Sequence, residues 1–103
     1  MSASFSFKAK LWVYDGKAAW HFVTLPKQTA LDIKTLTNND VLPRRGFGSV
    51  KVRVTCRGTS WDTSLFPDAK SGSYLLPISK NARKMVNMQA GETIDFKIIL
   101  LLI

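Results

Sequence analysis

The sequence predicts a mainly β fold, a small six-stranded barrel that is closed or half open and is capped by two short helices. Three observations lead to this fold class. Most segments alternate apolar and polar side chains with the period of a strand, turn-forming residues separate them, and two stretches carry apolar residues at helical spacing. Closure is expected because it hides the sheet edges. The 103 residues fit one domain, residues 1–103.

The first predicted hairpin has a tight turn. Asp15-Gly16 follows an alternating run and favours a two-residue turn, because both positions tolerate positive φ. This turn would pair Leu11 with Trp20 and Ala9 with Phe22 on the apolar face, whereas a longer turn would change the register. The opposite face would carry Lys8, Lys10, Trp12 and His21.

The clearest alternation covers residues 48–57, where Val50, Val52, Val54 and Cys56 share one face. Gly58-Thr59 is expected to form the next two-residue turn and to pair Cys56 with Trp61. In that register Thr63 points inward and Ser64 points outward.

Two prolines limit the later strands. Pro67 is expected to end the fourth strand, and Pro77 favours an edge position for the short strand at residues 74–78. The last strand, residues 93–103, is apolar on both faces beyond Lys97. Such a strand lies at the centre of a sheet or in a subunit interface.

Two short helices are expected. Thr29 and Asp32 form a capping-box pattern for a helix over residues 29–37, with aspartate in place of glutamate. Ser79 is a suitable N-cap for the second helix, which Ala90-Gly91-Glu92 would close. The inner face of the second helix would carry Ala82, Met85 and Val86, and its outer face Lys80, Arg83 and Lys84.

The charge balance favours an anionic partner. Fifteen basic and seven acidic residues give a net charge of +8, which suits nucleic acid, anionic lipid or a phosphorylated small molecule. One cysteine excludes an intramolecular disulfide. The first residues lack a signal-peptide pattern, and the apolar run between Ile98 and Ile103 is too short to span a bilayer. We therefore expect a cytoplasmic protein without a membrane span.

Several motifs together resemble a known family. They are RGFGSVKV from Arg45, W-x-T-S-L-F-P from Trp61 and Y-x-L-P-I from Tyr74. The chain resembles a family of small prokaryotic domains of unknown function, which occur alone or beside a YdeI/OmpD-associated module of the bacteriocin-protection type. The resemblance implies a double-split β-barrel, an architecture that DNA-binding transition-state regulators and antitoxins also use. It implies no activity and no catalytic residues.

The stretch around Gly46 and Gly48 is the first candidate anion site. Glycines there can turn successive backbone N–H groups into one concavity, and neighbouring arginines add charge. The alternative is a bend at the entry to a barrel strand, with the arginines in water. The N-terminus of the second helix is another candidate. The hypothetical ligand-binding residues are Arg44, Arg45, Gly46, Gly48, Ser49, Arg53, Arg57, Ser64, Lys80, Arg83 and Lys84.

A nucleic-acid surface is the alternative. Lys8 and Lys10 lie beside Trp12, and Lys51 shares a strand face with two arginines. Basic residues interleaved with aromatic ones can follow a phosphate backbone and stack bases. Against this, the sequence has no RNP-like aromatic pair on adjacent strands and no helix-turn-helix pattern.

Enzyme chemistry has few candidate residues. His21 is the only histidine, so it cannot build a metal site with Cys56 and scattered aspartates. Cys56 has the apolar parity of a packed, inert thiol. Asp62 is expected to pair with Arg53 or Arg57 rather than to act as a base. No metal and no cofactor are implied.

The sequence therefore predicts a non-enzymatic binding domain for an anionic small molecule or acidic group. The alternatives are a nucleic-acid-binding split barrel and a structural or interaction module. The last of these would form a homodimer through the apolar run from Ile98 to Ile103.

Overall fold

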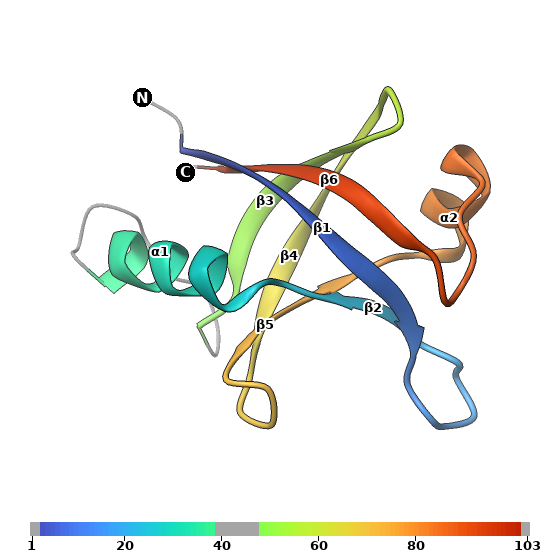
Figure 1. Cartoon of the computed structure of the whole chain (residues 1–103), viewed down its shortest axis with the longest axis horizontal. Coiled ribbons are helices and arrows are strands. Elements are labelled where there is room, and N and C mark those ends of the chain that lie inside the picture. The colour runs from blue at the N-terminus through green and yellow to red at the C-terminus, as the bar shows by residue number, and fades with distance from the viewer. Residues whose placement is uncertain (1–2, 39–47, 102–103) are drawn as a thin grey trace.

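The computed structural model describes residues 3–38 and 48–101. Within them, six antiparallel strands close into a barrel in the order β1-β2-β5-β4-β3-β6, which confirms the predicted fold class (Figure 1). The elements are β1 Ser4–Val13, β2 His21–Thr24, α1 Lys27–Asn38, β3 Val50–Cys56, β4 Thr59–Asp68, β5 Ser73–Pro77, α2 Lys80–Val86 and β6 Thr93–Leu100.

The barrel interior is filled by one side of each strand. In β3 and β6 every second residue is buried, as the alternation predicted. The Phe7 and Phe96 rings stack inside, with centroids 5.7 Å apart. The fully buried side chains include Leu11, Val23, Val52, Val54, Leu65, Leu76 and Ile98.

Strand β6 lies between β1 and β3, with which it pairs along both of its edges. Ile98 and Leu100 are buried inside the barrel, and Ile99 is half-buried on the outer side. Of the described part of the predicted dimer surface, Ile98 and Leu100 are used within the core, whereas Ile99 and Leu101 remain half-buried. The last two residues of that surface, Leu102 and Ile103, lie outside the described residues.

The predicted register of the first hairpin is wrong. Residues 14–20 form a longer connection, closed by a hydrogen bond from the Tyr14 N–H to the Trp20 carbonyl at 2.7 Å. Leu11 pairs with Val23, three residues beyond the predicted Trp20. Because side chains alternate with a period of two, an odd shift exchanges the faces of β2. Phe22 therefore lies on the outer face beside Trp12 instead of in the core.

The second hairpin turns one residue earlier than predicted. Arg57 and Gly58 take φ values of 49° and 80°, as a turn with two left-handed central residues requires. Cys56 consequently pairs with Thr59 rather than with Trp61. The shift is even, so Thr63 keeps the inward parity and Ser64 the outward one.

Both proline predictions are corrected. Pro67 lies within β4 and pairs with Tyr74, so the strand continues past it to Asp68. Strand β5 is not an edge, because it pairs with β2 on one side and with β4 on the other. Pro77 is its last residue, where the missing N–H interrupts little of the ladder.

The helices lie on opposite sides of the barrel (Figure 1). Helix α1 begins at Lys27, two residues before the predicted start, so the proposed capping box does not begin it. Helix α2 begins as predicted, with the Ser79 hydroxyl accepting from the Ala82 N–H at 3.1 Å. It ends at a left-handed Asn87, earlier than predicted. Met85, expected inside, is 57% exposed.

Candidate binding surfaces

The first predicted ligand arginine already has a protein partner. The Arg53 side chain donates to both carboxylate oxygens of Asp62, at 2.8 and 3.2 Å. This confirms the expected pairing of Asp62. The hydrogen bond from Arg53 lowers the pKa of Asp62 below its usual value. Because the pair is exposed on the outer face of β3 and β4, it contributes little to stability at neutral pH.

Arg57 ties its turn to the end of α2. Its Nη1 donates to the carbonyls of Val86 and Asn87, at 2.8 and 2.9 Å, and its Nη2 donates to Glu92 at 3.1 Å. These bonds satisfy carbonyls that the helix end leaves free. The Gln89 backbone N–H and then Arg57 lower the pKa of Glu92. The guanidinium therefore has a structural role here.

The basic residues predicted to form an anion site at the N-terminus of α2 do not converge on one position. The Arg83 Nη1 donates to the Ile78 carbonyl at 2.7 Å, beside the N-terminus of its own helix. Lys80 and Lys84 are exposed on α2, which has only seven residues. None of the hollows found among the described residues is lined by Arg57 together with Arg83 or Lys84.

The glycine-arginine stretch is only partly described. Arg44, Arg45 and Gly46 lie outside the described residues. Gly48 has a φ of 88°, where a side chain would be strained, and its Cα faces the Pro67 ring. Glycine at position 48 therefore allows the backbone turn that leads into β3. Ser49 lies beside it, and Ser64 lies further along on the outer face of β4, opposite Lys51.

The lowered carboxylate pKa values predict acid sensitivity. Asp62, Asp68 and Glu92 have pKa values below those of an unfolded chain, so their interactions stabilise the fold at neutral pH. This contribution is expected to be lost as the pH falls from about 4 through the folded-state pKa values. Urea midpoints measured between pH 7 and pH 3 should decrease. The decrease should be smaller in Asp62→Asn, and an equal decrease in both proteins would contradict the assignment.

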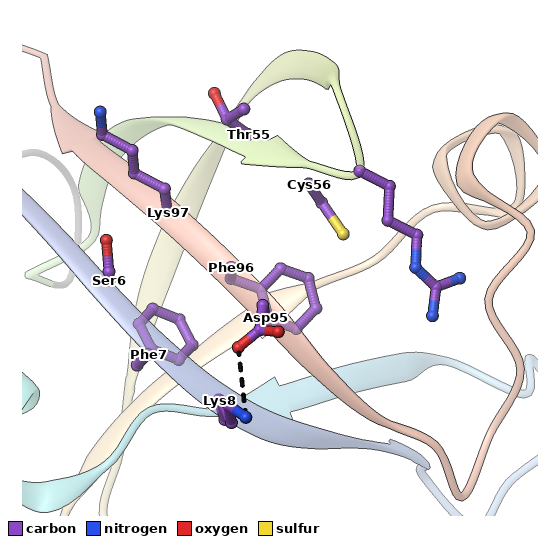
Figure 2. Close-up of a pocket in the computed structure, with 9 residues that line it drawn as sticks. Ser6, Phe7, Lys8, Thr55, Cys56, Asp95, Phe96 and Lys97 are labelled. Carbon is purple, nitrogen blue, oxygen red and sulfur yellow. Dashed lines mark ion pairs between the residues drawn. The ribbon is translucent and has the colours of Figure 1, made fainter.

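A basic hollow of about 430 Å³ lies over β1, β6 and the end of β3. Lys8, Arg57 and Lys97 line it, but Lys8 already approaches Asp95 at 3.9 Å. Figure 2 shows the Lys97 amine pointing away from the Lys8–Asp95 pair. The cations thus border the hollow without converging on one ligand atom. Cys56 is also in its lining, and burial raises the pKa of the thiol, as expected for an unreactive cysteine.

The opposite part of the barrel carries exposed aromatic rings. The Trp12 and Phe22 centroids are 5.3 Å apart, and Trp20 stacks on Phe22 at 6.5 Å with an angle of only 12°. The Trp12 Nε1–H donates to the Thr24 hydroxyl at 2.9 Å, which holds this ring in place. The actual register of β2 brings these rings together, because Trp12 pairs with Phe22, which the predicted register had placed in the core.

These rings border a shallow groove of about 430 Å³ across β2, β5 and β4. Trp20 is 59% exposed and Phe66 is 48% exposed, so both offer ring faces to solvent. No charged residue lines the groove. We call this surface the aromatic face; it comprises Trp12, Tyr14, Trp20, Phe22, Phe66, Leu75 and Pro77. The sequence signalled Trp12 but not Trp20 and Phe22, because the orientation of these two rings depends on the length of the first hairpin loop, which residue types do not specify.

The described ranges contain neither a candidate metal site nor a candidate membrane-spanning helix. Residues 3–38 and 48–101 contain no group of three potential metal-ligating side chains among His, Cys, Asp and Glu. In the same ranges no helix has both the length and the apolar character needed to span a bilayer. The Nδ1 of His21 bonds to the Ala19 carbonyl at 2.8 Å.

A closed antiparallel barrel with flanking helices and an open aromatic surface defines a small β-barrel domain. Comparison with protein families places it more specifically. The chain belongs to the family described as domain of unknown function (DUF1905), whose model matches residues 7–98. No curated protein matches the chain.

Proposed function

We propose that this domain is a non-enzymatic module that binds single-stranded nucleic acid on the aromatic face. The observation that carries the proposal is the contiguous row of rings formed by Trp12, Phe22 and Trp20, in which Trp20 is exposed and the other two rings are half-buried. Large exposed apolar surfaces of this kind usually serve binding. Unstacked bases gain about 1–3 kcal/mol each by stacking on such rings.

One cation lies beside the aromatic face. Lys10 is two residues before Trp12 on the same face of β1, which separates their Cα atoms by about 7 Å. Among the described residues, Lys10 makes no ion pair. Together with the net charge of +8, Lys10 favours a ligand that combines flat rings with phosphates.

The basic residues favour a small anionic ligand less than the sequence suggested. Arg53, Arg57 and Arg83 are all engaged by protein acceptors, so binding an anion there would require these bonds to break. An isolated phosphate would also leave the aromatic face unused. A strand of nucleic acid uses the rings and Lys10 together.

The experiment is a fluorescence titration with mixed single-stranded oligonucleotides of about eight nucleotides, within the site sizes of small barrel domains. We expect quenching of tryptophan emission and an affinity that falls with salt, with a log–log slope of about −0.7 for each phosphate contacted. Mononucleotides should bind much more weakly. Equal affinity for mononucleotides would favour a small-molecule site instead, and no salt-sensitive binding at low ionic strength would reject the proposal.

The expected cytoplasmic location and the expected neighbouring module are part of the same proposal. A cytoplasmic location suits a nucleic-acid ligand and the single thiol. A neighbouring YdeI/OmpD-associated module, expected from the resemblance, would give this domain the role of presenting a nucleic acid to a partner domain.

A further inference from the structure

A cleft of about 290 Å³ continues the aromatic face. It shares Trp20 and Pro77 with the groove described above and extends from them to Trp61 on β4. Unlike the groove, it carries polar side chains in its lining, among them His21, Thr63 and Ser79. The cleft is therefore chemically different from the rest of the surface.

The cleft opens because β4 and β5 separate. Their ladder ends at the pair of Phe66 and Leu75. Pro77, two residues further along β5, has no N–H to donate to β4. The chain instead follows β2, where the Ile78 N–H donates to the His21 carbonyl at 2.9 Å. The barrel wall is split at this point.

The split leaves a free edge on β4. Cys56 and Thr59 flank a two-residue turn, so they exchange both backbone hydrogen bonds, and every second pair along β3 and β4 does the same. By this alternation the backbone groups of Asp62 point away from β3, towards the cleft. In the part of the chain that the structure describes, no backbone hydrogen bond joins Asp62 to Ile78 or Ser79 across the cleft.

The polar side chains add specific donors and acceptors. The Ser79 oxygen accepts from the Ala82 N–H, which leaves its own proton free to donate. His21 Nδ1 must donate to the Ala19 carbonyl, so its Nε2 is the ring nitrogen available to a ligand. The Thr63 hydroxyl lines the cleft without a hydrogen bond to the rest of the described chain.

We infer that this cleft binds one nucleobase of the bound strand, turned out of the row that stacks on the aromatic face. A base edge presents adjacent donors and acceptors, which complement the N–H and C=O groups of a free strand edge. The indoles of Trp20 and Trp61 flank the cleft and cover the ring faces. The inference rests on the proposed function and adds a base-reading position to it.

The three tryptophans of the chain provide separate reporters. Trp12 belongs to the aromatic face, Trp20 to the junction and Trp61 to the cleft. Indole N–H signals followed by NMR during titration with oligothymidylate of about eight nucleotides should all shift. Shifts at Trp12 and Trp20 without one at Trp61 would overturn the cleft and leave the proposed function intact. If no signal shifts, both fail.

A variant pair tests whether the cleft reads the base. Thr63→Val removes the hydroxyl in the cleft at nearly constant volume, and Thr59→Val does the same on the same strand outside it. Thr63→Val should change the relative affinities for oligo-dA, oligo-dC and oligo-dT by about 2- to 10-fold, the effect of one hydrogen bond, with the salt slope unchanged. Identical base preferences in the two variants would overturn the inference. Thermal melts check that both variants fold.

Discussion

Replacing Ile98 with alanine should lower the free energy of unfolding by about 3 kcal/mol, within the range of about 2–5 kcal/mol for such truncations. Ile98 has no exposed surface and lies on β6, which pairs with both β1 and β3. The truncation removes buried methyl groups and leaves a cavity that three strands must close together. A domain of this size has a total stability of only about 5–15 kcal/mol.

Urea denaturation followed by circular dichroism measures this effect. Leu31→Ala is the control, because Leu31 is 57% exposed on α1 and alanine is the better helix former. The control should change stability by less than about 0.5 kcal/mol. A loss below about 1 kcal/mol in Ile98→Ala would show that the barrel wall can relax around the cavity.

The second large effect is expected on binding. Trp20→Ala and Phe66→Ala should each weaken binding of single-stranded oligonucleotides by about 5- to 150-fold, the equivalent of about 1–3 kcal/mol for one stacked base. Because both rings are about half exposed, their removal should alter stability little. The double variant should lose detectable binding. Phe22 is a poorer choice, since it also packs against Trp12.

Met85→Ala is the matched control for this experiment. Met85 is 57% exposed, as large an apolar exposure as that of the rings, but it lies on α2. Fluorescence anisotropy of a labelled oligonucleotide, at fixed salt, gives the affinities without depending on the tryptophans themselves. Unchanged affinity in Trp20→Ala and Phe66→Ala would contradict the role of the aromatic face. A changed sedimentation coefficient would instead make it an interface between copies.

The alternation of apolar and polar side chains was sufficient to predict which strand residues face the barrel interior. In β3 and β6 the period of two identified the buried residues correctly, because burial on one face of a strand depends only on parity. The Ser79 cap was also readable, since its hydroxyl bonds to a backbone group three residues away. Strand-face burial and the helix cap depend on residues close together in the sequence, so residue type and spacing are enough to predict them.

The strand register and the set of side chains left available on the surface could not be predicted from residue type and spacing. The residues Asp15-Gly16 are compatible with a two-residue turn, yet the chain uses residues 14–20, and the odd shift moved Phe22 from the core to the surface. The pairing of Arg53 with Asp62 was predicted correctly. The partners of Arg57 and Arg83 were missed, because only the folded chain brings the Glu92 carboxylate and the backbone carbonyls near them.

The sequence by itself determined the strand and helix content, the basic charge and the supply of aromatic and basic side chains. Those properties follow from composition and from short-range periodicity. Only the tertiary structure decided which of them are available. Closure of the barrel assigned three arginines to internal acceptors, placed β6 at the centre and gathered the aromatic rings on one open face. Each outcome depends on contacts between segments far apart in the chain. Strand register and packing decide these contacts, and residue type alone does not specify them.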